Sequence, residues 1–159
     1  MEKKMDLTQI RIPSPVGPIY LVASEKGLKQ LLFTKQDLPL SKTPNAILKL
    51  AMKELEQYFA HQRTKFTVPL DLEGTDFQQK VWKELSKISY GKTFSYKEVA
   101  LKLKNEKAVR AVGTANGKNP ICIIIPCHRV IAANGKLGGY SGGLEKKVEL
   151  LKLEGSLAI

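Results

Sequence analysis

The sequence is poor in the residues that build disulfide frameworks and metal centres. It contains two cysteines, Cys122 and Cys127, and two histidines, His61 and His128. A structural zinc site takes roughly four Cys or His ligands, so we expect no metal. A disulfide between cysteines so close in sequence would close only a tiny loop, and it would suit a secreted protein that nothing else indicates. Both thiols are therefore expected to be free.

Long apolar runs and nucleotide-binding motifs are missing as well. No stretch of about 18 apolar residues could span a membrane. The first residues, "MEKKMDLTQIRIPSP", carry charge but lack the apolar core of a secretory signal. The glycine-rich "LGGYSGG" lacks the Lys-Ser/Thr pair of a phosphate-binding loop. We expect a cytoplasmic protein with no cofactor and no membrane attachment.

Basic residues are in excess, and the formal net charge is +11. The excess is spread along the chain and forms no basic tail. A lysine-rich solvated surface explains it without any partner. A surface for nucleic acid explains it too, because a basic domain gains affinity by displacing counterions from phosphates. Charge does not choose between the two.

Two regions of different character predict an α/β (α+β) fold with two domains. Residues 1–70 are β-rich, since "TQIRI", "PIYLVAS" and "LKQLLFT" alternate or are apolar and predict an antiparallel meander. A helix with Asn45 as N-cap follows, and "KFTVPLDLEG" predicts a short strand. Residues 76–159 are mostly helical. A 159-residue chain that is 43% hydrophobic can bury cores for one domain or two small ones.

The second region contains a candidate helix-turn-helix. A first helix is predicted from Thr75 or Asp76. "SYKEVALKL" begins with a capping box of Ser95 and Glu98, and "KAVRAVGTANG" predicts a second short helix that ends near Gly117. The "CIII" run predicts a strand, and "LEKKVELLKLEG" a last helix that stops at Gly155.

The "KAVRAVGTANG" helix is unusually rich in small residues. Ala108, Ala111 and Gly113 surround one long cation, Arg110. A tightly packed core helix would explain this pattern. The alternative is a helix that presses into a DNA groove, with Arg110 extending into the groove.

Cys127 follows the apolar run, where Pro126 is expected to end the strand. Its thiol would then emerge beside His128. A thiol becomes a useful nucleophile when a base removes its proton, and that base usually needs an orienting third group. The last helix offers three acids: Glu145, Glu149 and Glu154. Catalytic cysteine and inert buried thiol both remain open on these grounds, whereas Cys122, inside the run, is expected to be an inert core residue.

Four segments together resemble the O6-alkylguanine-DNA alkyltransferases: "SYKEVA", "RAVGTANGKNP", "NPICIIIPCHRVI" and "GGYSGGLEKKVELLKLEG". "PCHRV" is that family's signature. The resemblance is dense over residues 76–155. Residues 1–70 match only in being a β-rich domain that precedes the catalytic one. It implies a monomer that binds double-stranded DNA containing O6-alkylguanine and moves the alkyl group irreversibly onto its own cysteine. Each molecule would then react once.

By this resemblance Cys127 accepts the alkyl group, His128 removes its proton through a water, and Glu154 orients His128. Tyr96 donates a hydrogen bond to guanine N3, and Asn119 supports the surroundings of the thiol. The implied substrate- and DNA-binding positions are Ser95, Ala108, Arg110, Ala111, Gly113, Val130, Tyr140, Ser141 and Lys147.

The resemblance also implies how the base is reached and recognised. The helix-turn-helix would bind the minor groove, and Arg110 would take the place of a base flipped out of the stack. Tyr140 and Ser141 would wall the pocket, while the carbonyls of Cys127 and Val130 would accept from the exocyclic amine. Lys147 would contribute to the site, as it does in some members, and a solvated surface lysine is the rival interpretation.

Two other functions fit parts of the pattern. A Cys–His hydrolase or acyltransferase would need an oxyanion hole and repeated turnover. A non-catalytic binder of alkylated DNA is the second, but the related binders carry Trp in place of the cysteine, so Cys127 argues against it. Asn116 and Cys122 replace residue types seen in some relatives, which leaves pocket width open.

Overall fold

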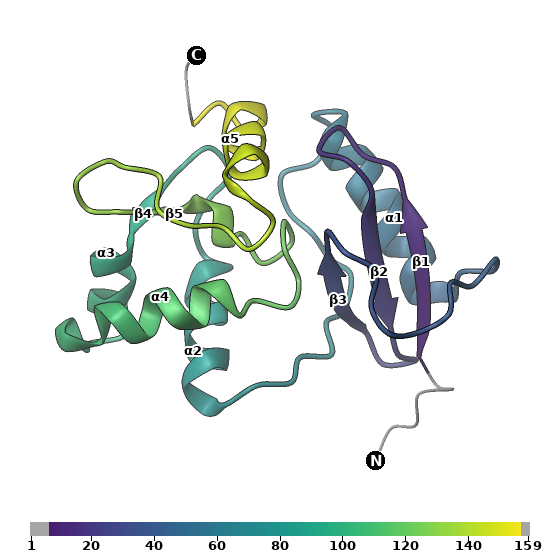
Figure 1. Cartoon of the computed structure of the whole chain (residues 1–159), viewed down its shortest axis with the longest axis horizontal. Coiled ribbons are helices and arrows are strands. Elements are labelled where there is room, and N and C mark those ends of the chain that lie inside the picture. Colours follow the sequence, from purple (N-terminus) through teal and green to yellow (C-terminus); the bar gives the residue numbers. More distant parts are fainter. Residues whose placement is uncertain (1–6, 157–159) are drawn as a thin grey trace. The chain divides into compact units, whose positions relative to one another are not determined.

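The computed structural model describes residues 7–156. The chain divides into two compact units, Met1–Glu73 and Gly74–Ile159. Both units mix helices with strands, and the C-terminal one is mostly helical, as predicted (Figure 1). Within residues 7–156, no helix combines the length and apolar character needed to cross a bilayer.

The N-terminal unit is built on the predicted antiparallel meander. Its strands are β1 (Thr8–Ile12), β2 (Ile19–Ala23) and β3 (Leu28–Leu32), paired in the order β1-β2-β3. Helix α1 (Ala46–Phe59) contacts β2 and β3 and covers the sheet (Figure 1). The side chain of Asn45 accepts a hydrogen bond from the Leu48 amide, so the predicted N-cap is confirmed.

The predicted strand within "KFTVPLDLEG" is wrong. Its only pairing within the described residues is an isolated bridge between Leu28 and Leu70. The buried carboxylate of Glu54 accepts hydrogen bonds from the amides of Thr67 and Val68, at 2.8 and 3.0 Å. These amides are therefore not available to a neighbouring strand.

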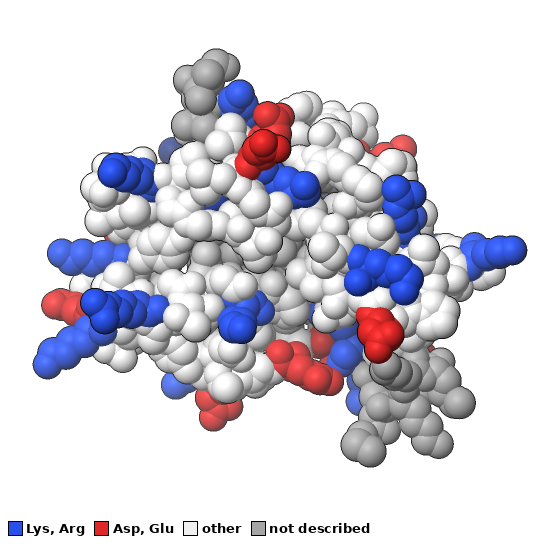
Figure 2. Space-filling model, in the orientation of Figure 1, with Lys and Arg blue, Asp and Glu red and all other residues white. Residues whose placement is uncertain are grey.

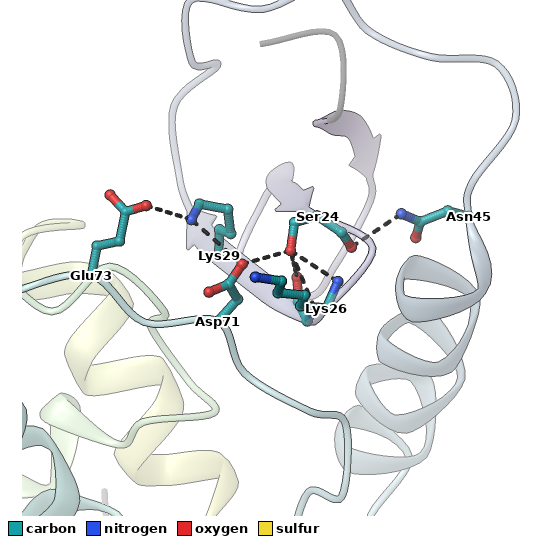
Figure 3. Close-up of polar contacts among 7 residues, drawn as sticks. Ser24, Lys26, Lys29, Asn45, Asp71 and Glu73 are labelled. Atoms are coloured by element: carbon teal, nitrogen blue, oxygen red, sulfur yellow. Dashed lines mark hydrogen bonds and ion pairs between the residues drawn. The ribbon is translucent and has the colours of Figure 1, made fainter. Parts of the chain in front are cut away.

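A polar cluster fixes the end of this unit to its sheet (Figure 3). Ser24 donates to Asp71 at 2.6 Å, and Lys29 contacts both Asp71 and Glu73, at 3.6 and 2.8 Å. Gly27 is required in this cluster, because a Cβ there would come within 2.8 Å of the backbone of Leu70. The chain thus leaves the first unit along a fixed path.

As far as residue 156, the C-terminal unit contains four α-helices: α2 (Asp76–Leu85), α3 (Tyr96–Lys102), α4 (Val109–Gly117) and α5 (Leu144–Leu153). α2 and α3 pack on α4, and the indole of Trp82 donates to the carbonyl of Ala115 in their core. Thr75 caps α2, and Ser95 and Glu98 form the predicted capping box of α3.

The α3–α4 pair has the form predicted for a helix-turn-helix. Residues 103–105 and a 3-10 turn, Glu106–Ala108, join the two helices. Ala108 is only 7% exposed. It packs into the unit, where a small side chain lets the helices approach.

The isoleucine run is a compact turn and not the predicted strand. The amide of Ile125 donates to the carbonyl of Ile121, and Ile123 has φ 72°, a left-handed conformation that costs a β-branched residue about 1–3 kcal/mol. Asn119 holds the turn, since its side chain donates to the Ile125 carbonyl and accepts from the Ile121 amide, at 2.7 and 2.9 Å.

The signature segment follows this turn directly. Cys127–Arg129 form a 3-10 turn, after which β5 (Val130–Ile131) pairs in parallel with β4 (Phe94–Ser95). This short sheet joins the thiol segment to the beginning of α3. Tyr96, the first residue of α3, is thereby placed near Cys127.

Candidate active site

Cys127 lies at a pocket of about 340 Å³ in the C-terminal unit. The residue is 2% exposed, so its thiol is buried rather than displayed on the surface. The walls of the pocket come from helices α3 and α4, the 3-10 turn Cys127–Arg129 and the glycine-rich loop before α5. The lining residues are Tyr96, Gly113, Asn116, Gly117, Cys127, Gly139, Tyr140 and Ser141.

His128 and Glu154 form a fully buried pair behind the thiol segment. Nε2 of His128 lies 2.8 Å from Oε2 of Glu154. A carboxylate only accepts, so Nε2 carries the hydrogen and Nδ1 keeps the basic lone pair. Nδ1 has no hydrogen-bond partner among the described residues. The arrangement leaves one oriented nitrogen able to take a proton.

Arg129 completes this pair, a role that the sequence did not reveal. Its guanidinium donates to both oxygens of Glu154, at 2.8 and 2.9 Å, and to the carbonyl of Ile88 at 2.6 Å. Burial raises the pKa of Glu154, but hydrogen bonds from His128 and Arg129 outweigh it and hold that pKa at about 2. The sequence offered one signal for this role: Arg129 is a charged residue beside the signature histidine, in an otherwise apolar segment.

The surroundings favour the neutral forms of both the Cys127 thiol and the His128 imidazole. A hydrogen bond with the Cys122 thiol and complete burial raise the pKa of Cys127 well above its ordinary value, although Asn119 and Lys147 lower it. Burial lowers the pKa of His128 more than Glu154 raises it. These shifts favour a thiol over a standing thiolate at Cys127, so a nucleophile there would have to form by proton transfer inside the site.

Lys147 is fully buried, so the surface interpretation of this residue is wrong. Its ammonium donates to the carbonyls of Val130, Leu137 and Gly139. Burial lowers its pKa to about 8. Lys147 thus connects β5 to the glycine-rich loop that walls the pocket.

Tyr96 is half-buried and faces the pocket, which goes against a purely core role. A Cβ at Gly113 would meet its ring at 3.8 Å, and one at Gly138 would come within 2.9 Å of its hydroxyl. The contact at Gly113 would be an ordinary one, so it is Gly138 that leaves room for the Tyr96 side chain. Ser141 lies on the opposite loop and contacts the thiol of Cys122 at 3.7 Å.

Helix α4 presents an outward face of small residues with one long cation. Arg110, Ala111, Thr114 and Gly117 are exposed at helical spacing, while Gly113 faces the pocket. Figure 2 shows basic side chains distributed over this part of the surface. The exposed basic residues of the α3–α4 segment are Lys97, Lys102, Lys104, Lys107, Arg110 and Lys118.

Two further predicted positions have structural partners. Ser95 accepts from the Glu98 amide as an N-cap, and the carbonyl of Val130 accepts from Lys147. Among residues 7–156, no three His, Cys, Asp or Glu side chains are grouped to hold a metal ion.

Two family models match the chain. The DNA-binding domain of 6-O-methylguanine DNA methyltransferase matches residues 76–156, and the ribonuclease-like domain of the same proteins matches residues 9–72. Together they cover both units.

Similar proteins carry the corresponding name. A methylated-DNA–protein-cysteine methyltransferase of Methanosarcina acetivorans is 51% identical over 148 residues, 90% of this chain and 95% of that protein. One of Mycobacterium bovis is 50% identical over 152 residues, 92% of each chain. Among solved structures, Mycobacterium tuberculosis OGT in complex with DNA aligns with a TM-score of 0.84 at 48% identity, over 94% of this chain and 93% of that one.

Proposed function

Because the chain belongs to the 6-O-methylguanine DNA methyltransferase family, we propose that Cys127 is its acceptor of alkyl groups. The protein repairs alkylated DNA by transfer to a cysteine. The observation that carries the assignment is that Cys127 borders a pocket and is followed directly in the chain by His128, which is paired with Glu154. Cys122, the other thiol, is fully buried and does not line that pocket.

The proposed reaction begins with a proton transfer. The thiol proton passes through a water to Nδ1 of His128, the nitrogen with no hydrogen-bond partner within residues 7–156. Glu154 and Arg129 stabilise the imidazolium that results. The thiolate then attacks the alkyl carbon. A carbon–sulfur bond forms as the bond from that carbon to guanine O6 breaks, and the product is a thioether.

Tyr96 acts on the leaving group. Its hydroxyl lies in the pocket with a pKa raised by burial and by Cys127, so it stays protonated and donates to guanine N3. The hydrogen bond stabilises the negative charge that develops on the base as it leaves. The purine anion becomes neutral guanine when it takes up one proton, which balances the proton that the Cys127 thiol gave to His128. Asn119 acts indirectly, because it holds the turn that places Cys127.

The target base must leave the duplex to reach a buried thiol. Arg110 is exposed on α4, among residues small enough for close approach to a narrow groove. We assign it the place in the stack that the flipped base leaves, with α4 in the minor groove. Reaction through a free thiol suits a reducing compartment, and we place the protein in the cytoplasm.

A titration tests this function. Methylated duplex in excess over protein is expected to lose one lesion per protein molecule, after which the reaction stops. Repair of many lesions by each molecule would indicate a turning-over enzyme, and tight binding without transfer would indicate a lesion sensor.

A further inference from the structure

Asn116 is a buried amide on α4 that lines the pocket and is only 5% exposed. Its Nδ2 donates to the carbonyl of Cys127 at 3.4 Å. Its Oδ1 has no hydrogen-bond donor among the described residues. Buried acceptors without a donor are rare in folded proteins, so this oxygen calls for an explanation.

The orientation of the amide follows from its partner. The Cys127 carbonyl only accepts, so Oδ1 in that position would bring two acceptors together. The amide nitrogen therefore faces Cys127, and the oxygen is the group left without a donor.

The other acceptors near the thiol already have protein donors. The Val130 carbonyl accepts from Lys147 at 2.7 Å, and the Cys127 carbonyl accepts from Asn116. A carbonyl can accept a second bond, but a donor on a ligand gains most at an oxygen with none. Oδ1 of Asn116 is such an oxygen.

We propose that Oδ1 of Asn116 accepts a hydrogen bond from the exocyclic 2-amino group of the target base. Alkylation at O6 removes the N1 proton, so this amine is the N–H donor that an O6-alkylguanine base in DNA retains. An O4-alkylthymine base has no such donor. Asn116 is thus a specificity-determining residue that favours guanine, an inference that rests on the proposed function.

The test compares two duplexes that differ only in the amine, one with O6-methylguanine and one with O6-methylhypoxanthine. Rate constants for alkyl transfer are measured with DNA in excess, on the same protein preparation, so that an inactive fraction cancels in their ratio. Loss of a hydrogen bond to a buried acceptor slows the second substrate by roughly fivefold to a hundredfold in the unmodified protein. Equal rates would overturn the inference.

Two substitutions separate the oxygen from the nitrogen of the amide. Asn116→Leu removes both the oxygen and the nitrogen, and it is expected to bring the ratio of the two rate constants close to one. If the leucine variant does not fold, Asn116→Ala takes its place in the comparison. Asn116→Asp keeps the acceptor but loses the donor to Cys127, so it should react more slowly with both substrates and keep the ratio.

The outcomes are distinct. A leucine or alanine variant with the ratio of the unmodified protein overturns the inference. Loss of the ratio in the aspartate variant as well overturns it too, because the effect would then come from the Cys127 carbonyl. If the unmodified protein transfers methyl from neither duplex, the proposed function itself fails, and the inference fails with it.

Discussion

Oε2 of Glu154 accepts from two groups at once, Nε2 of His128 at 2.8 Å and Nη2 of Arg129 at 2.9 Å. The carboxylate therefore orients the proposed base and neutralises a buried guanidinium. Glu154, the C-cap of α5, thus connects the catalytic assignment to the stability of the C-terminal unit.

Replacement of that carboxylate should be costly. Glu154→Gln leaves the charge of Arg129 buried without a counterion, so we expect the free energy of unfolding to fall by about 3–5 kcal/mol. Urea denaturation measures it. Glu149→Gln, at an exposed position of the same helix, is the control and should change stability by less than about 0.5 kcal/mol.

The same pair gives a prediction in pH. The pKa of Glu154 is about 2 in the folded protein against an ordinary 4.5, so its contribution is complete above pH 4.5 and is lost as pH falls towards 2. The stability gap between the unmodified protein and Glu154→Gln should therefore shrink between pH 6 and pH 3. Glu54 and Asp71, whose pKa values are also lowered, are common to both proteins. A constant gap would contradict the assignment.

The rate of alkyl transfer should show a wide plateau in pH. In the proposed mechanism, reaction starts from a protonated Cys127 and a neutral His128, and burial lowers the pKa of His128 below 6.5. With free O6-benzylguanine as substrate, the rate constant should stay level from pH 8 to pH 6.5 and decline only at lower pH. A rate that rises tenfold per pH unit across this range would instead indicate a free thiolate.

Gly138 offers a test of the pocket wall. Alanine at this position would be strained by the positive φ of 72°, and its Cβ would lie 2.9 Å from the Tyr96 hydroxyl. Gly135→Ala is the matched control, because it has φ 83° and open space around the position. Both variants should lose about 1–2 kcal/mol of stability. Only Gly138→Ala should slow the reaction with O6-benzylguanine, and equal rates in the two variants would remove Tyr96 from the mechanism.

Much of this architecture was predictable from local pattern. The meander, α1, the start of α2 near Thr75 and the capping box at Ser95 follow from alternation, helical periodicity and side chains that reach nearby amides. Such signals act within a few residues. The parts of the site that depend on them, such as the start of α3 at Tyr96, were found.

The remainder depends on side chains that meet from distant positions. The isoleucine run has the composition of a strand, yet Asn119 folds it into a turn through two hydrogen bonds. Arg129 donates to Glu154, and Lys147 donates to three carbonyls, only when α5 packs against the signature segment. Composition and periodicity do not predict these long-range hydrogen bonds.

Arg110 should matter for duplex DNA and little for a free base. Arg110→Ala is expected to lower the rate of methyl transfer from duplex O6-methylguanine by roughly tenfold to a hundredfold, because nothing then offsets the cost of unstacking. Its rate with free O6-benzylguanine should stay near that of the unmodified protein. Equal losses on both substrates would remove the role in base flipping.

The central claim is that one buried thiol, Cys127, takes the alkyl group and keeps it. Intact-mass spectrometry after incubation with duplex O6-methylguanine, followed by peptide mapping, tests this directly. The account predicts one added methyl group per molecule, on Cys127, in the unmodified protein and in Cys122→Ser, and none in Cys127→Ser. An unchanged mass, or a methyl group on Cys122, would contradict it.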